Sequence, residues 1–291
     1  MSHSEYRLGL VLVTASAIAW STAGFFTRSI LLDTWTMLAW RGVFGALGIA
    51  VFMLVREGAG AVSSFRSMSW PGWVFVVVSG TGMIFFITSL RHTTVAHVAA
   101  IYASAPFVAA ALGWIIIRER PTGHAVGASF AAFAGVALTV GFGAEGNLFG
   151  DLLAFGMTFA MAVMMVIARR YQGIAVMATA CLSALLCGLV CWPMGEPTAV
   201  SGHELLLLAL FGLVNSAIGL VLFIIGARLL PAIDTALIGS LDVPLAPLWV
   251  WLSFNETPSG ATIAGGILVF VAITYHVVRG RQKNVPLDQP F

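Results

Sequence analysis

Ten long apolar segments divide this sequence, and they constrain its fold more than any other feature. Each is about 20–24 residues long, enough for an α-helix to cross the roughly 30 Å hydrocarbon core of a bilayer. Their apolar residues lack the period-two alternation of an outer-membrane barrel. We therefore predict ten membrane-spanning helices at residues 8–30, 34–55, 70–90, 95–117, 123–142, 148–168, 174–194, 205–227, 234–254 and 259–278.

Charged residues are too scarce for the surface of a water-soluble protein. They make up 9% of the chain and hydrophobic residues 59%, whereas soluble domains carry about 25% charged residues. The net charge of +2 comes without a dense Lys/Arg cluster, which excludes a nucleic-acid-binding protein. These features predict an all-α integral membrane protein whose main partner is the lipid bilayer.

The three cysteines indicate neither a metal site nor a disulfide. Cys181, Cys187 and Cys191 lie in one apolar segment, without a neighbouring His or further Cys to complete a metal site. The sequence also lacks a Walker motif, a CxxC pair and a Gly-rich nucleotide loop. We therefore expect buried free thiols and no cofactor.

The basic residues predict the orientation of the spans. With a cytoplasmic N-terminus, eleven of the fourteen Lys and Arg residues fall in cytoplasmic segments, Arg28 and Arg91 fall on the opposite side, and Arg41 lies within a span. Positive residues concentrate on the cytoplasmic side of membrane proteins, so we expect both termini there. The eleven are Arg7, Arg56, Arg66, Arg118, Arg120, Arg169, Arg170, Arg228, Arg279, Arg281 and Lys283.

An internal repeat divides the chain into two halves. The pattern Glu-x-Pro-Thr/Ser-Gly occurs at 119–123 and again at 256–260, an offset of 137 residues that also relates Arg91 to Arg228. The first and sixth spans correspond at an offset of 141, which pairs Arg28 with Arg169. Because five spans is an odd number, the second unit crosses the membrane in the opposite direction, as in many transporters. We predict two inverted five-helix repeats, at 1–142 and 143–291.

The same segments resemble a known family. The sequences Leu-Arg-His-Thr-Thr at 90–94, Ala-Pro-Phe at 105–107 and Arg-Glu-Arg-Pro-Thr-Gly at 118–123, with the echo at 228–277, resemble the EamA domain of the drug/metabolite transporter superfamily. Gly-Asp-Leu-Leu-Ala at 150–154 resembles the start of its second copy. The resemblance covers essentially the whole chain. Trp20 departs from the repeat, because Met161 stands at the matching place.

Within that family the chain is most similar to bacterial inner-membrane amino-acid exporters, in particular those for aromatic amino acids. The resemblance implies a multi-pass inner-membrane protein with a small-molecule substrate. It also implies a central cavity lined by the first, third, fourth, sixth, eighth and ninth spans, with release by alternating access.

Two charged residues within spans are the first candidates for a substrate site, because a charge at a helix centre costs about 2.5–3.5 kcal/mol on insertion scales. Arg41 either attracts a substrate carboxylate, or extends outward or binds backbone carbonyls of a neighbouring helix. Asp242 precedes Pro244 and Pro247, where the helix should bend. It either binds a substrate ammonium or a proton, or it forms a hydrogen bond between helices.

Other candidates are polar or aromatic residues within spans. The polar ones lie at equivalent positions of the third and eighth spans, and they either line a cavity or allow close helix packing. The aromatic ones form either the walls of an apolar pocket or part of the core. These residues are Ser79, Thr81, Asn215, Ser216, Trp20 and Tyr102.

Several other residues have a structural interpretation beside the functional one. Asp234 is interpreted as an N-cap, His97 as a packing histidine near the outer mouth, and Glu119 and Glu256 as residues that tie helix ends in tight turns. Stripes of small residues predict close helix packing. They are Gly42-Ala46-Ala50, Gly127-Ala131-Gly135 and Ala180-Ala184-Gly188.

These features favour a secondary transporter that exports amino acids. An exporter of drugs or other metabolites of the same superfamily is the main alternative. An intramembrane enzyme is a remote one, because no HExxH or GxSxG motif occurs and the embedded His and Asp residues lie on different spans.

Overall fold

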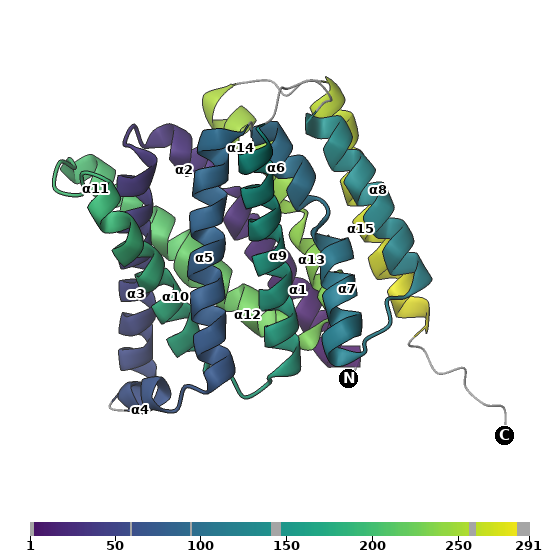
Figure 1. The fold of residues 1–291 in the computed structure, drawn as a ribbon, viewed down its shortest axis with the longest axis horizontal. Helices are drawn as coiled ribbons and strands as arrows, with labels where there is room; N and C mark the ends of the chain where they lie inside the picture. The colour runs from purple at the N-terminus through teal and green to yellow at the C-terminus, as the bar shows by residue number, and fades with distance from the viewer. Residues whose placement is uncertain (1–2, 59, 94, 141–146, 256–259, 284–291) are drawn as a thin grey trace.

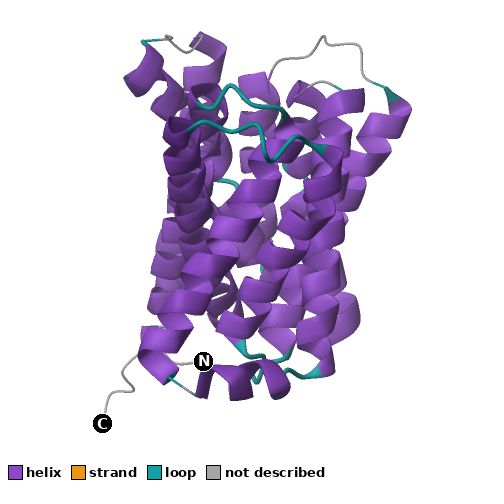
Figure 2. Ribbon diagram, turned by 90° about the vertical axis from the view of Figure 1, so that its left-hand side faces the viewer, coloured by secondary structure: helices purple, strands orange, loops and turns teal. Residues whose placement is uncertain are grey.

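The computed structural model describes residues 3–58, 60–93, 95–140, 147–255 and 260–283, and these residues form helices joined by short connections (Figure 1). No strand occurs among them. The helices run between the two ends of an elongated bundle, and α1 begins at the end where α15 finishes (Figure 2). The boundary that we predict between the halves, at 142/143, lies outside the described residues.

The described chain contains α-helices, one short 3₁₀-helix (η1) and one π-helix (η2). They are α1 (His3–Ser21), α2 (Ala23–Ser29), α3 (Thr34–Glu57), α4 (Gly60–Arg66), α5 (Trp70–His92), α6 (Val95–Tyr102), α7 (Ala105–Ile117), α8 (Gly123–Val140), α9 (Leu148–Arg170), α10 (Val176–Cys191), η1 (Trp192–Met194), α11 (Gly202–Phe211), η2 (Gly212–Gly219), α12 (Leu220–Leu229), α13 (Ala232–Gly239), α14 (Asp242–Phe254) and α15 (Gly260–Lys283).

Six helical segments are long and apolar enough to cross a membrane, judged over the described residues. A seventh forms if α4 and α5, which meet at 84°, are taken as one bent span. Three shorter apolar helices lie at Ala105–Ile117, Gly123–Leu138 and Ile263–Val278. The chain is therefore an all-α, multi-pass membrane protein, and each predicted span overlaps one helix or a run of helices.

Three predicted spans are broken in the structure. α1 and α2 separate at Thr22, α6 and α7 at residues 103–104, and α13 and α14 at residues 240–241. The last break occurs where the prolines predict a bend. Pro106 and Pro244 fall in the first turns of α7 and α14, where a missing backbone N–H removes no bond within the helix.

The two broken pairs match one another residue by residue. α6, α7 and the start of α8 correspond to α13, α14 and the start of α15, with the same offset of 137 residues at every helix end. The residues that end α7 and α14, Arg118 and Asn255, are both left-handed, with φ of 56° and 54°. The backbone therefore repeats where the sequence does. The second Glu-x-Pro-Ser-Gly motif lies outside the described residues up to Ser259.

Stripes of small residues form close helix contacts, as predicted. A methyl group on Gly42 of α3 would lie 2.5 Å from the amide nitrogen of Gly188 of α10. One on Gly135 of α8 would lie 2.8 Å from the carbonyl oxygen of Gly265 of α15. Gly127, at the other end of its stripe, has open space around it. The predicted stripe on α8 is thus a tight contact only at its Gly135 end.

Candidate functional site

Arg41 is a buried cation among uncharged neighbours. It is 9% exposed, seven residues into α3. Its guanidinium lies 3.5 Å from the amide oxygen of Asn215, 3.4 Å from the sulfur of Met83, and 5.4 Å from the ring centre of Phe211. Its Nε has no partner. The thiol of Cys187 on α10 also lies close enough to interact with it. No carboxylate forms an ion pair with Arg41 within the described part of the chain.

Asn215 joins the Arg41 side chain to α1. Its amide nitrogen donates to the carbonyl oxygen of Ala19 at 3.0 Å, while its amide oxygen faces Arg41. In return, the indole N–H of Trp20 donates to the backbone oxygen of Asn215 at 3.0 Å, and its ring packs 5.0 Å from that of Phe223. Three of the predicted site residues, Trp20, Arg41 and Asn215, therefore meet at one place.

The backbone around Asn215 is a π-helix, which sequence reasoning did not predict. Isolated π-segments are rare and occur most often at functional sites. Here the wide turn is stabilised from α1, because Ser16 donates to the carbonyl oxygen of Gly219 at 2.8 Å and Trp20 donates to that of Asn215. The side chains of α1 thus compensate backbone oxygens in the irregular segment.

Tyr102 and Asp242 lie at the two helix breaks. Tyr102 is the last residue of α6, and Asp242 is the first of α14, close enough to interact electrostatically with Tyr102. Both are half-buried, and the Oδ1 atom of Asp242 has no hydrogen-bond partner. α14 is also linked to the break in α1, since Trp249 donates to Ser21 at 2.8 Å.

The remaining predicted site residues occupy different surroundings. Ser216 is buried against α3, where a methyl group on Gly45 would meet its Cβ at 2.4 Å, so it lies in a helix contact. Ser79 is half-buried on α5. Thr81 is two residues further along α5, and a helix turns by about 200° over two residues, so its side chain points away from that of Ser79. It is exposed on the same helical stripe as Trp73 and Val77. The structure does not bring Thr81 to Arg41.

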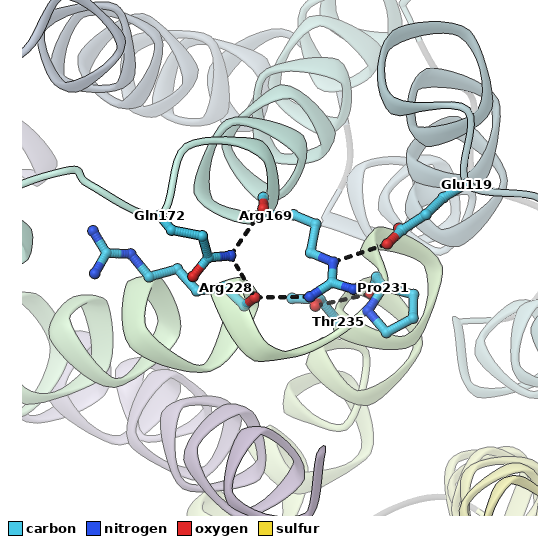
Figure 3. A network of polar contacts seen from close by, with 6 residues as sticks. All are labelled: Glu119, Arg169, Gln172, Arg228, Pro231 and Thr235. Carbon is cyan, nitrogen blue, oxygen red and sulfur yellow. Dashed lines mark hydrogen bonds and ion pairs between the residues drawn. The ribbon is translucent and has the colours of Figure 1, made fainter. Parts of the chain in front are cut away.

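A polar network joins three helix ends at one end of the bundle (Figure 3). Arg169 of α9 donates to the carboxylate of Glu119 and to the carbonyl oxygen of Arg228, each at 2.9 Å. Gln172 donates to the carbonyl oxygens of Arg169 and Arg228, each at 3.0 Å. The guanidinium of Arg228 binds the carbonyl oxygen of Ile174. Glu119 therefore connects the end of α7 to the second half of the chain. It also lies in the turn that follows α7.

Asp234 is not the N-cap that the sequence predicts, because Pro231 precedes α13 at that position. Its side chain points into the protein instead, where it accepts a hydrogen bond from Tyr6 at 2.9 Å and lies 3.1 Å from the imidazole of His276. The capping interpretation was based on the proline that precedes Asp234. Its actual partners are more than forty residues away in the sequence, so a local pattern could not predict them. The side chain of His97 and the whole of Glu256 lie outside the described residues.

Sequence reasoning missed several residues of these clusters. Met83, Phe211 and Trp249 belong to the environment of Arg41 and of the α1 break, and Tyr6 and His276 to that of Asp234. Apolar and aromatic residues are common in every span, so residue type alone does not identify those that belong to a site. His276 is a polar residue within the last predicted span, and this position could have identified it as a candidate.

The multi-pass helical fold with a repeated backbone and a buried cation is typical of a membrane transporter. A family comparison agrees: residues 7–141 and 148–277 each match the EamA-like transporter family, and the chain belongs to this family. A solved structure titled "Crystal structure of protein" is similar over 95% of this chain and 99% of that one, with a TM-score of 0.80 and 20% identity. A search of curated proteins gave no match.

Proposed function

We propose that this protein exports amino acids, including aromatic ones, across the bacterial inner membrane by alternating access. The six long segments, the bent pair and the three shorter apolar helices then make ten crossings, arranged as two inverted repeats at 1–142 and 143–291. Both termini lie in the cytoplasm. The repeated helix ends at an offset of 137 residues support this arrangement.

The observation that carries the choice of substrate is the unpaired guanidinium of Arg41. A buried charge is costly unless a counter-charge compensates it, and no carboxylate pairs with Arg41 within the described residues. A substrate carboxylate would supply that charge through charge-assisted hydrogen bonds. Asn215 holds the guanidinium in place and leaves its Nε available.

Other residues of both halves offer groups for the rest of an amino acid. Asp242 has a carboxylate oxygen without a partner and suits a substrate ammonium. Trp20 and Tyr102 supply aromatic surface for an apolar side chain. Arg41 and Asp242 belong to opposite repeats, so binding would draw the two repeats together.

The polar network of Figure 3 then closes one face of the transporter. It ties the ends of α7, α9 and α12, which lie on the cytoplasmic side in the proposed orientation. The Arg169–Glu119 ion pair would have to break for substrate to enter from the cytoplasm. It is partly exposed, so it contributes about 1 kcal/mol or less and can open readily.

Exchange in proteoliposomes tests the function. Vesicles are loaded with unlabelled phenylalanine, and uptake of radiolabelled phenylalanine is measured against vesicles without protein. We expect exchange by the natural protein and at least an approximately tenfold loss in Arg41→Gln, equivalent to about 1.4 kcal/mol or more of binding. Thr158→Val, a buried change on α9 whose hydroxyl binds the carbonyl oxygen of Ala154 in its own helix, should exchange normally.

Competition separates the proposed substrate from the main alternative. Phenylalanine should inhibit exchange, whereas phenethylamine, the same molecule without the carboxylate, should inhibit much less. Equal inhibition by the amine, or no exchange of any amino acid above empty vesicles, contradicts the proposal and favours an exporter of other metabolites.

A further inference from the structure

Tyr6, Asp234 and His276 form a buried polar cluster where α1, α13 and α15 meet. The Tyr6 hydroxyl donates to one oxygen of Asp234 at 2.9 Å, and Nε2 of His276 lies 3.1 Å from the other. The side chains of His276 and Asp234 are only 1% and 9% exposed. The three residues come from opposite ends of the sequence, so the cluster links the two repeats.

A second imidazole connects this cluster to the surface. The ring of His124, at the start of α8, stacks on that of His276 with 5.1 Å between ring centres and 25° between planes. His124 is only half-buried and contacts the exposed Thr122. A titratable group thus lies between the buried cluster and the end of the bundle.

The buried imidazole is close to the carboxylate without a linear hydrogen bond. Its Nε2 is within ion-pair distance of Asp234, but the ring is not oriented to donate a hydrogen bond to the carboxylate. Its Nδ1 has no hydrogen-bond partner among the described residues. An imidazolium beside a carboxylate is a compensated pair, whereas a neutral imidazole leaves Asp234 as a buried negative charge with Tyr6 as its hydrogen-bond donor. The cluster therefore has two protonation states that differ in buried charge.

Other charged groups near α13 are engaged elsewhere. Arg169 of α9, Arg228 of α12 and Glu119 after α7 bind one another or backbone oxygens in the network of Figure 3. On α1, Glu5 and Arg7 flank Tyr6 at exposed positions. On α14, Asp242 lies beyond the helix break, near Tyr102. Within the described residues, Tyr6 of α1 and His276 of α15 face Asp234, and His124 of α8 stacks on His276.

We infer that the Tyr6–Asp234–His276 cluster is a proton-binding site, reached through His124, whose occupancy controls the movement of α13. With the proton bound, the imidazolium holds α13 to α15 through Asp234. Without it, that attraction is lost, and α13 is free to move about the break at residues 240–241. In its effect on transport, this inference rests on the proposed function.

Histidine NMR tests proton binding without any substrate. The full-length protein is labelled at its histidine rings in detergent micelles, and the His276 signal is assigned by its loss in His276→Gln. We expect this signal to change with pH, because a bound proton alters the ring, and to respond differently in Asp234→Asn, which removes the facing carboxylate. A signal that does not change with pH, or that changes identically in Asp234→Asn, overturns the inference.

Transport tests the control of α13. Phenylalanine exchange by the natural protein should depend on internal and external pH, and Asp234→Asn and His276→Gln should flatten this dependence while keeping exchange within about threefold at its optimum. Tyr6→Phe, which keeps the ring, should shift the profile without flattening it. Variants that lose stability and exchange equally at every pH overturn the inference, because that outcome indicates a purely structural cluster.

The failures of the two proposals can be told apart. If the natural protein exchanges no amino acid, the proposed substrate is wrong, and the NMR titration alone decides the proton site. If exchange occurs but its pH profile is the same in Asp234→Asn, the substrate proposal stands and the proton site does not.

Discussion

Asn215 connects helix packing to the candidate site at the scale of a single residue. Its amide nitrogen satisfies the carbonyl oxygen of Ala19, and its amide oxygen faces Arg41. Removing the side chain takes away the oxygen acceptor of Arg41, which costs about 1–3 kcal/mol for a buried polar group. It also removes one donor to the carbonyl oxygen of Ala19, which Thr22 continues to bind at 2.6 Å. Asn215→Ala would therefore lower stability and transport together, and it cannot separate the two roles.

Asn215→Asp separates them. The variant places a carboxylate next to Arg41 and supplies the counter-charge that we propose the substrate provides. The ion pair with Arg41 should offset the lost donation to Ala19, so stability should fall less than in Asn215→Ala. Affinity for phenylalanine should fall by about tenfold or more. Thermal unfolding in detergent and exchange kinetics measure the two quantities. Unchanged affinity in a stable variant would show that the substrate does not bind Arg41.

Asp33 makes stability depend on pH at the start of α3. Partial burial raises the pKa of its carboxyl group, but hydrogen bonds from Thr36, Trp35 and Glu196 lower it more, so the pKa lies below its ordinary value. A carboxyl group with a lowered folded pKa contributes stability above its unfolded pKa, and this contribution disappears as pH falls through the folded pKa. The loss should therefore occur below about pH 4.

The variant Asp33→Asn tests this dependence, because asparagine caps a helix equally well but does not titrate. The unfolding temperature of the natural protein should fall as the pH is lowered below about 4, and the variant should show a smaller fall. Parallel curves for the two proteins over this range would contradict the assignment. Differential scanning fluorimetry in detergent makes the measurement.

At the scale of helices, the glycines of α3 and α8 offer a matched pair. Gly42→Ala places a methyl group 2.5 Å from the backbone of α10, so the helices must separate, and we expect a loss of about 1–3 kcal/mol. Gly127→Ala meets nothing within 4 Å and should be neutral or stabilising by about 0.5–1 kcal/mol. Unfolding temperatures of both variants check the contrast, and equal effects would contradict the packing.

The sequence predicted the positions of the helices better than the side-chain contacts between them. Apolar length located the spans, and prolines located one break, because both depend on local chain chemistry. The contact of Asp234 with Tyr6 spans 228 residues, so it depends on tertiary packing that no local pattern encodes. The π-helix escaped prediction for a similar reason, since its free carbonyl oxygens are compensated from α1. Of the residues that meet near Arg41, the sequence singled out Trp20 and Asn215, whereas Met83 and Phe211 carried no local signal.

For the whole molecule, orientation in the membrane can be tested with exposed loop residues. Thr198 and Gln172 are exposed, and the three native cysteines are buried. In the proposed orientation, Thr198→Cys should react with a membrane-impermeant maleimide in spheroplasts, whereas Gln172→Cys should react only after permeabilisation. The natural protein should remain unlabelled. The reverse pattern would invert the topology, and labelling of both on one side would contradict the number of crossings between them.

The equal spacing of the repeated helices also indicates where the chain accepts extra residues. Between His92 and Gly123, and between Leu229 and Gly260, the two copies have kept the same length, whereas the connection 58–69 has a helix, α4, of its own. Buried helix breaks fix their chain length because every added residue would misplace the helices on both sides. A peptide tag should therefore be tolerated near Thr198 but not at either break, which makes that loop the natural position for a reporter.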